Sequence, residues 1–350
     1  MKHALKIYGT LGPACADKDI LVEMFRAGMT GIRLNLSHCS LPEREDWLSR
    51  LYQACDSLHI IPDFLVDLQG PELRVGKLSD NLILKEASEV RLIPLSKLPL
   101  SEDSDRLPAI PCPDILFSYL EEGQVIKMDD GKLKLNISRG RDSSDIRARV
   151  QIGGPLLSGK SIAIEGVSIP LPSLTDQDLD TIRLLRQYRV TGVMQPFVRS
   201  REDLMVLRRE LLKAGMDYVK VYAKIETEEG IDHVMDFLPG CDEIIIARGD
   251  LGSAIPLPRL PIVQKELASI CRMTKKPFMV VTQMLASMEE KPVPTRAELS
   301  DIANAVLDGA SSIMLTGETA AGKYPVEAMK IFCQTAYEAQ RYLRTGARII

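Results

Sequence analysis

The stretch that decides the fold is Tyr218-Val219-Lys220-Val221-Tyr222-Ala223-Lys224-Ile225-Glu226. Its first six residues are rich in β-branched and aromatic types, which favour a buried strand. A second run, Asp242-Glu243-Ile244-Ile245-Ile246, leads into Ala247-Arg248-Gly249-Asp250-Leu251-Gly252. In both cases polar side chains begin where the strand is expected to end. In barrels of parallel strands and helices the active site lies at the carboxyl ends of the strands, so both motifs are candidates for it.

Strand-like and helix-like runs alternate along most of the chain, which is typical of a parallel sheet with helical crossovers. We expect helices over 17–27 and 201–212, where apolar residues recur on one face. Eight strands are expected, the number that closes a (β/α)8 TIM barrel. They are 4–9, 30–35, 62–67, 192–197, 218–224, 243–247, 277–282 and 311–315.

The alternation breaks between about 70 and 166. Short alternating runs, 89–93 and 132–137, are separated by turn residues such as Asp129-Asp130-Gly131. We therefore predict a TIM-barrel domain over 1–69 and 167–350, with an inserted, small, all-β, β-barrel-like lid domain over 70–166. An insertion after the third strand would rise from the catalytic end and move over bound substrate, although a purely structural insertion is the alternative.

Composition excludes several classes of protein. The formal net charge is −4, without the concentrated basic face that nucleic-acid binding requires. Seven widely spaced cysteines, with no Cys-x-x-Cys pair, indicate reduced thiols rather than a disulfide frame or a zinc site. No segment resembles a signal peptide or a membrane span, so we expect a cytoplasmic protein without a membrane partner.

The two opening motifs supply the parts of a magnesium–phosphate site. Glu226 and Asp250 offer hard oxygen ligands, and Mg²⁺ is typically held by one or two carboxylates with substrate oxygens. The backbone amides of Gly249 and Asp250 can face an anion. Two structural alternatives remain open: Lys224 and Glu226 form a simple ion pair, and the glycines serve only a turn.

Other strand ends carry polar residues as well. Arg33, Asn35 and Ser37 alternate at the end of the second strand, and Arg33 suits a phosphate oxygen. Asn35, Ser37 and Asp67 form an oxygen-rich set that suits an alkali cation better than zinc. Thr282 ends the seventh strand, where its hydroxyl can bind phosphate or relay a proton. His38 is interpreted as a structural group rather than a base.

Taken together, these motifs resemble the pyruvate kinase family, and they occur in order across nearly the whole chain. The residues that carry the resemblance are Lys6-Ile7, 10–14, Gly28-Met29, 33–38, Asp67, 70–74, 129–131, 197–199, 224–226, 247–252, 282–285, 294–298, 304–310 and 317–320.

The resemblance implies a barrel with a lid and a glycolytic transferase that moves phosphate between phosphoenolpyruvate and ADP, giving pyruvate and ATP. It implies Mg²⁺ or Mn²⁺ on Glu226 and Asp250, and Lys224 with Arg33 against the transferred phosphoryl group. The substrate carboxylate would lie on the Gly249-Asp250 amides and Thr282, and Thr282 would relay a proton through water to the enolate. Such chemistry relies on positioning and on neutralising negative charge.

The resemblance also implies a K⁺ site and a nucleotide site. Asn35, Ser37, Asp67 and the Leu68 carbonyl match the family's K⁺ ligands, while Arg74, His38 and Asn35 lie where the nucleotide is expected.

Three departures from the family pattern affect these expectations. Many relatives carry Thr-Lys at Leu68-Gln69, which makes K⁺ an uncertain cofactor. Ile164-Glu165 stand where the lid usually has basic residues before Gly166-Val167, so a cation for the nucleotide is expected to be missing unless Lys160 replaces it. Most relatives also continue into a further α/β domain with an effector site; this chain ends sooner, and we expect it to lack that regulation.

Two alternatives to an active kinase remain open. One is a non-catalytic or weakly active relative that binds phosphoenolpyruvate. The other is a lyase or aldolase that stabilises a pyruvate enolate on Mg²⁺, against which the paired Arg33 and Arg74 argue. The expected partners are small molecules, and a homo-oligomer is compatible with the sequence.

Overall fold

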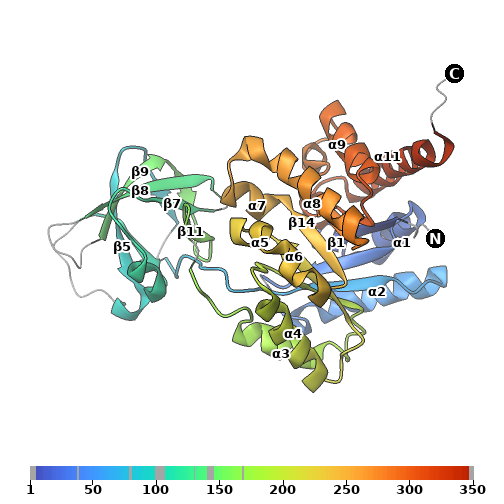
Figure 1. Cartoon of the computed structure of the whole chain (residues 1–350), viewed down its shortest axis with the longest axis horizontal. Helices are drawn as coiled ribbons and strands as arrows, with labels where there is room; N and C mark the ends of the chain where they lie inside the picture. Colours follow the sequence, from blue (N-terminus) through green and yellow to red (C-terminus); the bar gives the residue numbers. More distant parts are fainter. Residues whose placement is uncertain are drawn as a thin grey trace. The chain divides into compact units, whose positions relative to one another are not determined.

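The computed structural model describes residues 5–37, 39–78, 81–98, 107–129, 131–139, 146–167 and 169–346. The chain divides into two compact units, drawn in Figure 1. Unit 1 comprises Met1–Gly70 and Ser173–Ile350, and unit 2 comprises Pro71–Pro172. Each unit is described by itself below.

Unit 1 is built on a closed barrel of eight parallel strands, which confirms the predicted fold class. The order around the barrel is β1-β16-β15-β14-β13-β12-β3-β2. All eight predicted strands are present, and none of their ends differs from the predicted one by more than two residues. They are β1 (Lys6–Leu11), β2 (Gly31–Asn35), β3 (Asp63–Asp67), β12 (Gly192–Gln195), β13 (Lys220–Ile225), β14 (Glu243–Ala247), β15 (Phe278–Val281) and β16 (Ser312–Met314).

Helices lie outside these strands (Figure 1). Several begin at a side-chain cap that satisfies free backbone N–H groups: Thr175, Ser200 and Thr295 each form a capping box with the acid three residues on. The helices are α1 (Lys18–Arg26), α2 (Glu45–Leu58), α3 (Asp176–Leu184), α4 (Arg201–Lys213), α5 (Glu228–Asp232), α6 (Val234–Phe237), α7 (Arg248–Ala254), α8 (Leu260–Thr274), α9 (Arg296–Leu307), α10 (Gly317–Ala320) and α11 (Pro325–Thr345), with 3-10 turns η1 (Pro42–Arg44), η4 (Leu238–Gly240), η5 (Leu257–Arg259) and η6 (Ala286–Glu289).

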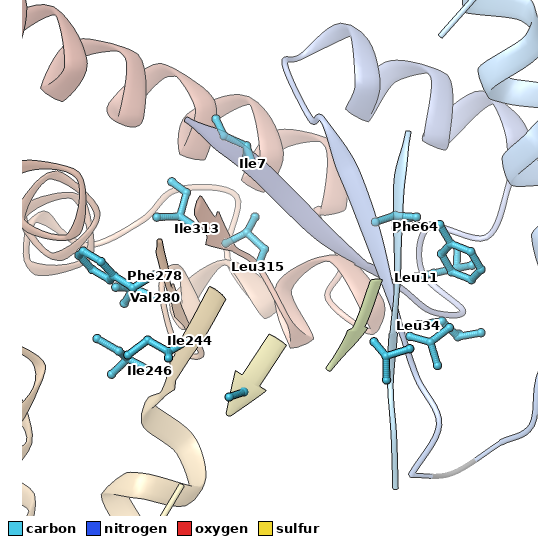
Figure 2. Packing of buried hydrophobic residues seen from close by; sticks show 14 of the residues in the cluster. Ile7, Leu11, Leu34, Phe64, Ile244, Ile246, Phe278, Val280, Ile313 and Leu315 are labelled. Carbon is cyan, nitrogen blue, oxygen red and sulfur yellow. The ribbon is translucent and has the colours of Figure 1, made fainter. Parts of the chain in front are cut away.

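Alternation along each strand divides the apolar residues between two cores. One set faces the helices and forms the larger core; Figure 2 labels members of it, including Ile7, Phe64 and Ile244. The other set fills the inside of the barrel and is smaller. It consists of Tyr8, Leu65, Met194, Tyr222, Ile245, Ala247, Met279, Val281 and Met314. The barrel is therefore a packed core rather than a channel.

The inside of the barrel is polar at the amino ends of its strands. Lys6 pairs with Asp63, and the Tyr8 hydroxyl donates to the same carboxylate over 3.1 Å. Gly31 is required beside them, because a Cβ there would stand 2.5 Å from the Tyr8 ring. Ser312 donates to the buried carboxyl of Glu243. These contacts lie at the opposite end of the strands from the motifs singled out in the sequence.

Unit 2 is mainly β structure around its own apolar core. A six-stranded sheet runs β11-β7-β8-β9-β5-β6, and a small sheet pairs β10 with β4. The strands are β4 (Leu82–Leu84), β5 (Glu89–Pro94), β6 (Ala109–Cys112), β7 (Val125–Met128), β8 (Leu133–Arg139), β9 (Ile146–Ile152), β10 (Gly154–Leu156) and β11 (Ile162–Ile164), with 3-10 turns η2 (Leu95–Lys97) and η3 (Asp114–Ser118). The turn predicted at 129–131 has Asp129 and Gly131 at positive φ, while Asp130 lies outside the described residues.

The boundaries of unit 2 differ from the predicted 70 and 166. The unit begins at Pro71 and ends at Pro172. The second difference has a physical reason, because Val167 and Ile169 pack against the apolar core of unit 2 rather than the barrel. The turn at Gly166 follows the last strand of unit 2, but the apolar core of unit 2 also includes contacts from the residues beyond this turn.

The seven cysteines are free, as expected from their spacing, and all of them are buried. Burial raises the pKa of thiols such as Cys15 and Cys112 to about 12, which keeps them protonated and unreactive. Within the described part of the chain, no helix combines the length and the apolar character that crossing a membrane requires.

The first prediction concerns the stability of the barrel. Burial raises the pKa of Glu243 to about 7, against the favourable effects of Ser312, Lys6 and Lys220. Because the folded pKa lies above the unfolded one, ionisation destabilises the fold, and the penalty develops as pH rises from about 4.5 to about 7. We expect Glu243→Gln to raise the free energy of unfolding by about 2 kcal/mol at pH 8 and to have little effect at pH 4.5. Urea unfolding at both pH values measures this.

The exposed Glu338→Gln serves as the control, with no change expected at either pH. A stabilisation by Glu243→Gln that is equal at pH 4.5 and pH 8 would contradict the assignment of the penalty to ionisation.

Candidate active site

A cavity of about 450 Å³ lies in unit 1 at the carboxyl ends of the barrel strands. Most of the site residues predicted from sequence converge on it, although they come from different strands. Arg33 and Asn35 come from β2, Asp67 from β3, Lys224 and Glu226 from the end of β13, Asp250 from α7, and Thr282 follows β15. A cavity of this size is in the range of small-molecule sites.

A buried network of charges lies in this cavity. Arg33 donates to Asp67 Oδ2 from Nε over 3.0 Å and from Nη2 over 2.6 Å. Lys224 Nζ lies 3.2 Å from the same Asp67 oxygen and 2.9 Å from Glu226 Oε1. The other oxygen of Glu226 accepts from the Phe197 backbone N–H over 2.9 Å. The two carboxylates are about 1% exposed, so these contacts act with little solvent screening.

The protonation of this network follows from its burial. Burial alone would lower the pKa of the Lys224 ammonium, but the carboxylates of Asp67 and Glu226 outweigh burial and raise that pKa above its usual value. Lys224 is therefore a fixed cation. Burial raises the pKa of Glu226 above its usual value; Lys224 opposes this shift, while the nearby Asp250 and Asp67 increase it. The positive charge near Glu226 is therefore too small to stabilise its ionised carboxylate fully.

Glu226 and Asp250 fit a magnesium ion. Glu226 Oε1 is buried and contacts Lys224 Nζ over 2.9 Å, and no backbone N–H among the described residues donates to it. No group of three or more His, Cys, Asp or Glu suited to a metal occurs among the described residues. Two carboxylates, one of them with a buried oxygen that only a cation contacts, match Mg²⁺, which takes few protein ligands and completes its shell with water and substrate oxygens.

Thr282 has a strained backbone at the edge of the cavity. Its φ is +75° and that of Gln283 is +56°, a region in which β-branched residues are rarely found. Arg248 supports this turn by donating to the carbonyls of Val281 over 3.3 Å and Thr282 over 2.8 Å. Gly249 packs closely against Thr282, because a Cβ at position 249 would lie 3.1 Å from Thr282 Cγ2. Strain of this kind clusters at functional sites.

Two buried carboxylates hold the loops around the cavity, and sequence reasoning missed both. Glu318 accepts from the Leu285 N–H over 2.9 Å and the Thr316 N–H over 2.7 Å, so it joins the loops after β15 and β16. Asp178 accepts from the backbone N–H groups of Gln69, Gly70 and Thr175. Only the position of Asp178 three residues after a helix cap was visible in the sequence.

Of the residues expected to bind K⁺, Asn35 and Asp67 line the cavity, whereas Ser37 and Leu68 do not. Asp67 Oδ1 is buried without a hydrogen-bond partner, which suits a cation. Asn35 lines the cavity, and its side-chain oxygen accepts from the Ser37 N–H over 3.2 Å. Leu68 is buried and donates its N–H to Met194. Neither Ser37 nor Leu68 lines the cavity.

The remaining predicted residues either belong to unit 2 or lie outside the described residues. Arg74 belongs to unit 2, where it pairs with Glu72 and donates to the Gly159 carbonyl over 2.7 Å. Lys160 pairs with Asp129 over 2.8 Å in the same unit. His38 lies outside the described residues.

Comparison with known proteins agrees with this site. The chain matches the family model described as pyruvate kinase, barrel domain, over residues 2–329. It is 34% identical over 336 residues to a pyruvate kinase of Staphylococcus epidermidis, covering 96% of this chain and 57% of the relative. It is 35% identical over 345 residues to the pyruvate kinase of Geobacillus stearothermophilus, covering 98% of this chain and 58% of the relative.

The chain belongs to the pyruvate kinase family. The family match confirms the predicted resemblance, and it extends through unit 2 as well as the barrel. The chain spans 57–58% of the length of these pyruvate kinases.

The second prediction tests the support of the site by Asp178. Replacing Asp178 by Ala leaves three backbone N–H groups without their acceptor, so we expect the free energy of unfolding to fall by about 3 kcal/mol. Asp178→Asn keeps one acceptor oxygen and should lose about half as much. Asp180→Ala, on the exposed side of the same helix, is the matched control and should change stability by less than about 0.5 kcal/mol. Urea unfolding measures all three; equal effects of Asp178→Ala and Asp180→Ala would contradict the role of Asp178.

Proposed function

We propose that this chain transfers a phosphoryl group between phosphoenolpyruvate and ADP, giving pyruvate and ATP, as a glycolytic kinase. The observation that carries the proposal is the buried network of Arg33, Asp67, Lys224 and Glu226, with Asp250 beside it, in one cavity of a chain from this family.

The charges of the cavity favour a divalent cation together with an anion. Among the charged side chains that line the cavity, Arg33, Arg44 and Lys224 are positive and Asp67, Glu226 and Asp250 are negative when ionised, so their formal charges sum to zero. A divalent cation would change this to +2, which attracts an anionic substrate. The proposed resident cation is Mg²⁺ or Mn²⁺ on Glu226 and Asp250, and it would supply neutralisation of phosphate charge when bound.

Lys224 and Arg33 are proposed to stabilise the phosphoryl group during transfer. Lys224 is kept protonated by two carboxylates, and Arg33 is held by a two-nitrogen contact with Asp67. Groups fixed in advance stabilise developing charge without reorganising, which is the main source of catalysis in phosphoryl transfer.

The three-carbon part of the substrate is proposed to bind beside Gly249, Asp250 and Thr282. The amides of Gly249 and Asp250 and the Thr282 hydroxyl would donate hydrogen bonds to its carboxylate. After the phosphoryl group leaves the enol oxygen, carbon 3 of the enolate must gain a proton, and Thr282 would deliver it through water. The support of the Thr282 backbone by Arg248 fixes this hydroxyl in place.

The remaining site assignments are also proposals. Asn35, Ser37, Asp67 and the Leu68 carbonyl would hold K⁺, for which the orphaned Asp67 Oδ1 is the supporting observation. Arg74, His38 and Asn35 would approach the nucleotide, with unit 2 acting as the lid. A cytoplasmic location and a homo-oligomer stay predictions.

One observation favours the second candidate, a phosphoenolpyruvate-binding relative with weak transfer. Lys127 pairs with Glu165 over 2.9 Å and Lys160 with Asp129 over 2.8 Å, so both lysines are already neutralised within unit 2. Turnover separates the two candidates, because the second binds phosphoenolpyruvate without forming pyruvate from ADP. Exchange of pyruvate protons without nucleotide would instead favour the lyase or aldolase reading.

The third prediction is a test of Lys224. Wild-type protein with Mg²⁺, phosphoenolpyruvate and ADP should form pyruvate in a coupled assay, and Lys224→Met should lower kcat about 100-fold or more. Lys220→Met is the matched control, since Lys220 lies at the exposed amino end of the same strand and should leave kcat unchanged. Full activity of Lys224→Met would refute its role, and circular dichroism checks that the variant is folded.

The fourth prediction is a test of the metal ligands. Glu226→Gln removes a charged oxygen ligand, so we expect the Mg²⁺ concentration for half-maximal activity to rise about tenfold or more. Glu228→Gln, an exposed acid two residues away, should leave it unchanged. An unaltered Mg²⁺ requirement in Glu226→Gln would show that this carboxylate does not bind the metal.

A further inference from the structure

Arg44 is a cation of the cavity that no carboxylate of the described residues neutralises. The described cationic side chains that line the cavity are Arg33, Arg44 and Lys224, and Arg33 and Lys224 contact Asp67. Among the described residues none places a carboxylate within ion-pair distance of Arg44, and its Nε is buried without a hydrogen-bond partner. Its acidic neighbour, Glu43, instead accepts from the Ser40 N–H over 2.8 Å.

Trp47 holds Arg44 in place. The Arg44 guanidinium lies over the Trp47 ring, 4.5 Å from its centre. Trp47 lines the cavity and also packs against the barrel's larger apolar core, so it forms a fixed support. A stacked guanidinium keeps its edge free for hydrogen bonds, and a planar fork matches the oxygens of a phosphate.

The surroundings of Arg44 differ from the metal side of the cavity. Arg44 ends η1 immediately before α2, and its polar neighbour is the Cys39 thiol, whose pKa is raised by burial so that it stays neutral. The proposed metal ligands Glu226 and Asp250 come from β13 and α7 instead. The Arg44 cation therefore lies without a carboxylate partner among the described residues, on the side of β2 and α2. An anionic ligand would neutralise its charge there.

We propose that Arg44, supported by Trp47, binds the diphosphate of the nucleotide that accepts the phosphoryl group. The identity of this ligand as a nucleoside diphosphate rests on the proposed function. Arg33 and Lys224 serve the transferred phosphoryl group, and the three-carbon acid is assigned to the opposite side, beside Thr282. Arg44 is then a binding residue for the second substrate.

Trp47 provides the test, because it is the only tryptophan of the chain and its fluorescence reports directly on this site. With Mg²⁺ present, ADP should change the emission of the wild-type protein, whereas adenosine, which lacks phosphate, should not. Inorganic phosphate and phosphoenolpyruvate are titrated in parallel. Isothermal titration calorimetry gives the same midpoints independently of changes in the tryptophan environment.

Arg44→Gln should raise the ADP midpoint and the KM for ADP about tenfold, as expected for one charge-assisted contact, with the KM for phosphoenolpyruvate changed less than about twofold. Arg44→Lys keeps the charge but loses the planar guanidinium, so we expect an intermediate rise in the ADP midpoint. This variant also tests the contact if Arg44→Gln does not fold. Arg50→Gln is the control, since Arg50 lies on the exposed side of α2 beside Asp46.

The outcomes are distinguishable. Unchanged ADP binding in both Arg44 variants, or an equal rise for ADP and phosphoenolpyruvate, would overturn the inference even if turnover is normal. If wild-type protein binds ADP through Arg44 but forms no pyruvate, the inference stands and the proposed reaction fails.

Discussion

The carboxylate of Asp67 is the contact on which the site depends. One oxygen of this buried group receives Arg33 from β2 and Lys224 from β13, so three strands meet at one point of the barrel mouth. Removing one member of a buried charge network leaves the others uncompensated, at a cost of about 3–5 kcal/mol. The two cations therefore keep their positions before any ligand arrives. Their burial also makes their fields strong where a phosphoryl group would lie.

Around this network, polar side chains such as Arg248 and Glu318 hold the loops in place. Arg248 fixes the strained turn at Thr282 and is itself paired with Asp301 over 2.6 Å. Glu318 joins two neighbouring loops through backbone N–H groups. Such contacts offset the strain of an unfavourable backbone conformation, and they preorganise the side chains that it displays.

The barrel could be predicted from sequence because its signal is local. Apolar runs such as 243–247 recur between amphipathic helices, and the polar residues that follow them must meet at one end of a parallel barrel. This is why Lys224, Glu226 and Asp250 were identified before their contacts were known. The pairing of Arg44 with Trp47 could not be identified in the same way, because the polarity of a residue near a helix start does not reveal which ring or cavity it faces.

Other features were hidden for related reasons. The positive φ of Thr282 follows from tertiary contacts, since threonine itself prefers strands. Val167 and Ile169 follow the predicted domain end at 166 and pack against the core of unit 2, so packing rather than the turn at Gly166 decides which core they join. The assignment of Leu68 to K⁺ rests on the family pattern alone, whereas Ser37 was also predicted from the oxygen-rich set that it forms with Asn35 and Asp67.

The three backbone bonds to Asp178 have a consequence for how this architecture arises. Gln69 and Gly70 are the last residues of unit 1 before unit 2, and Thr175 lies shortly after the chain returns to unit 1. The Asp178 carboxylate therefore joins the two points at which the chain leaves and re-enters unit 1. A gap with its ends already joined tolerates inserts of different length at small entropic cost. Unit 2 can then be replaced or change its shape during evolution while the barrel stays closed.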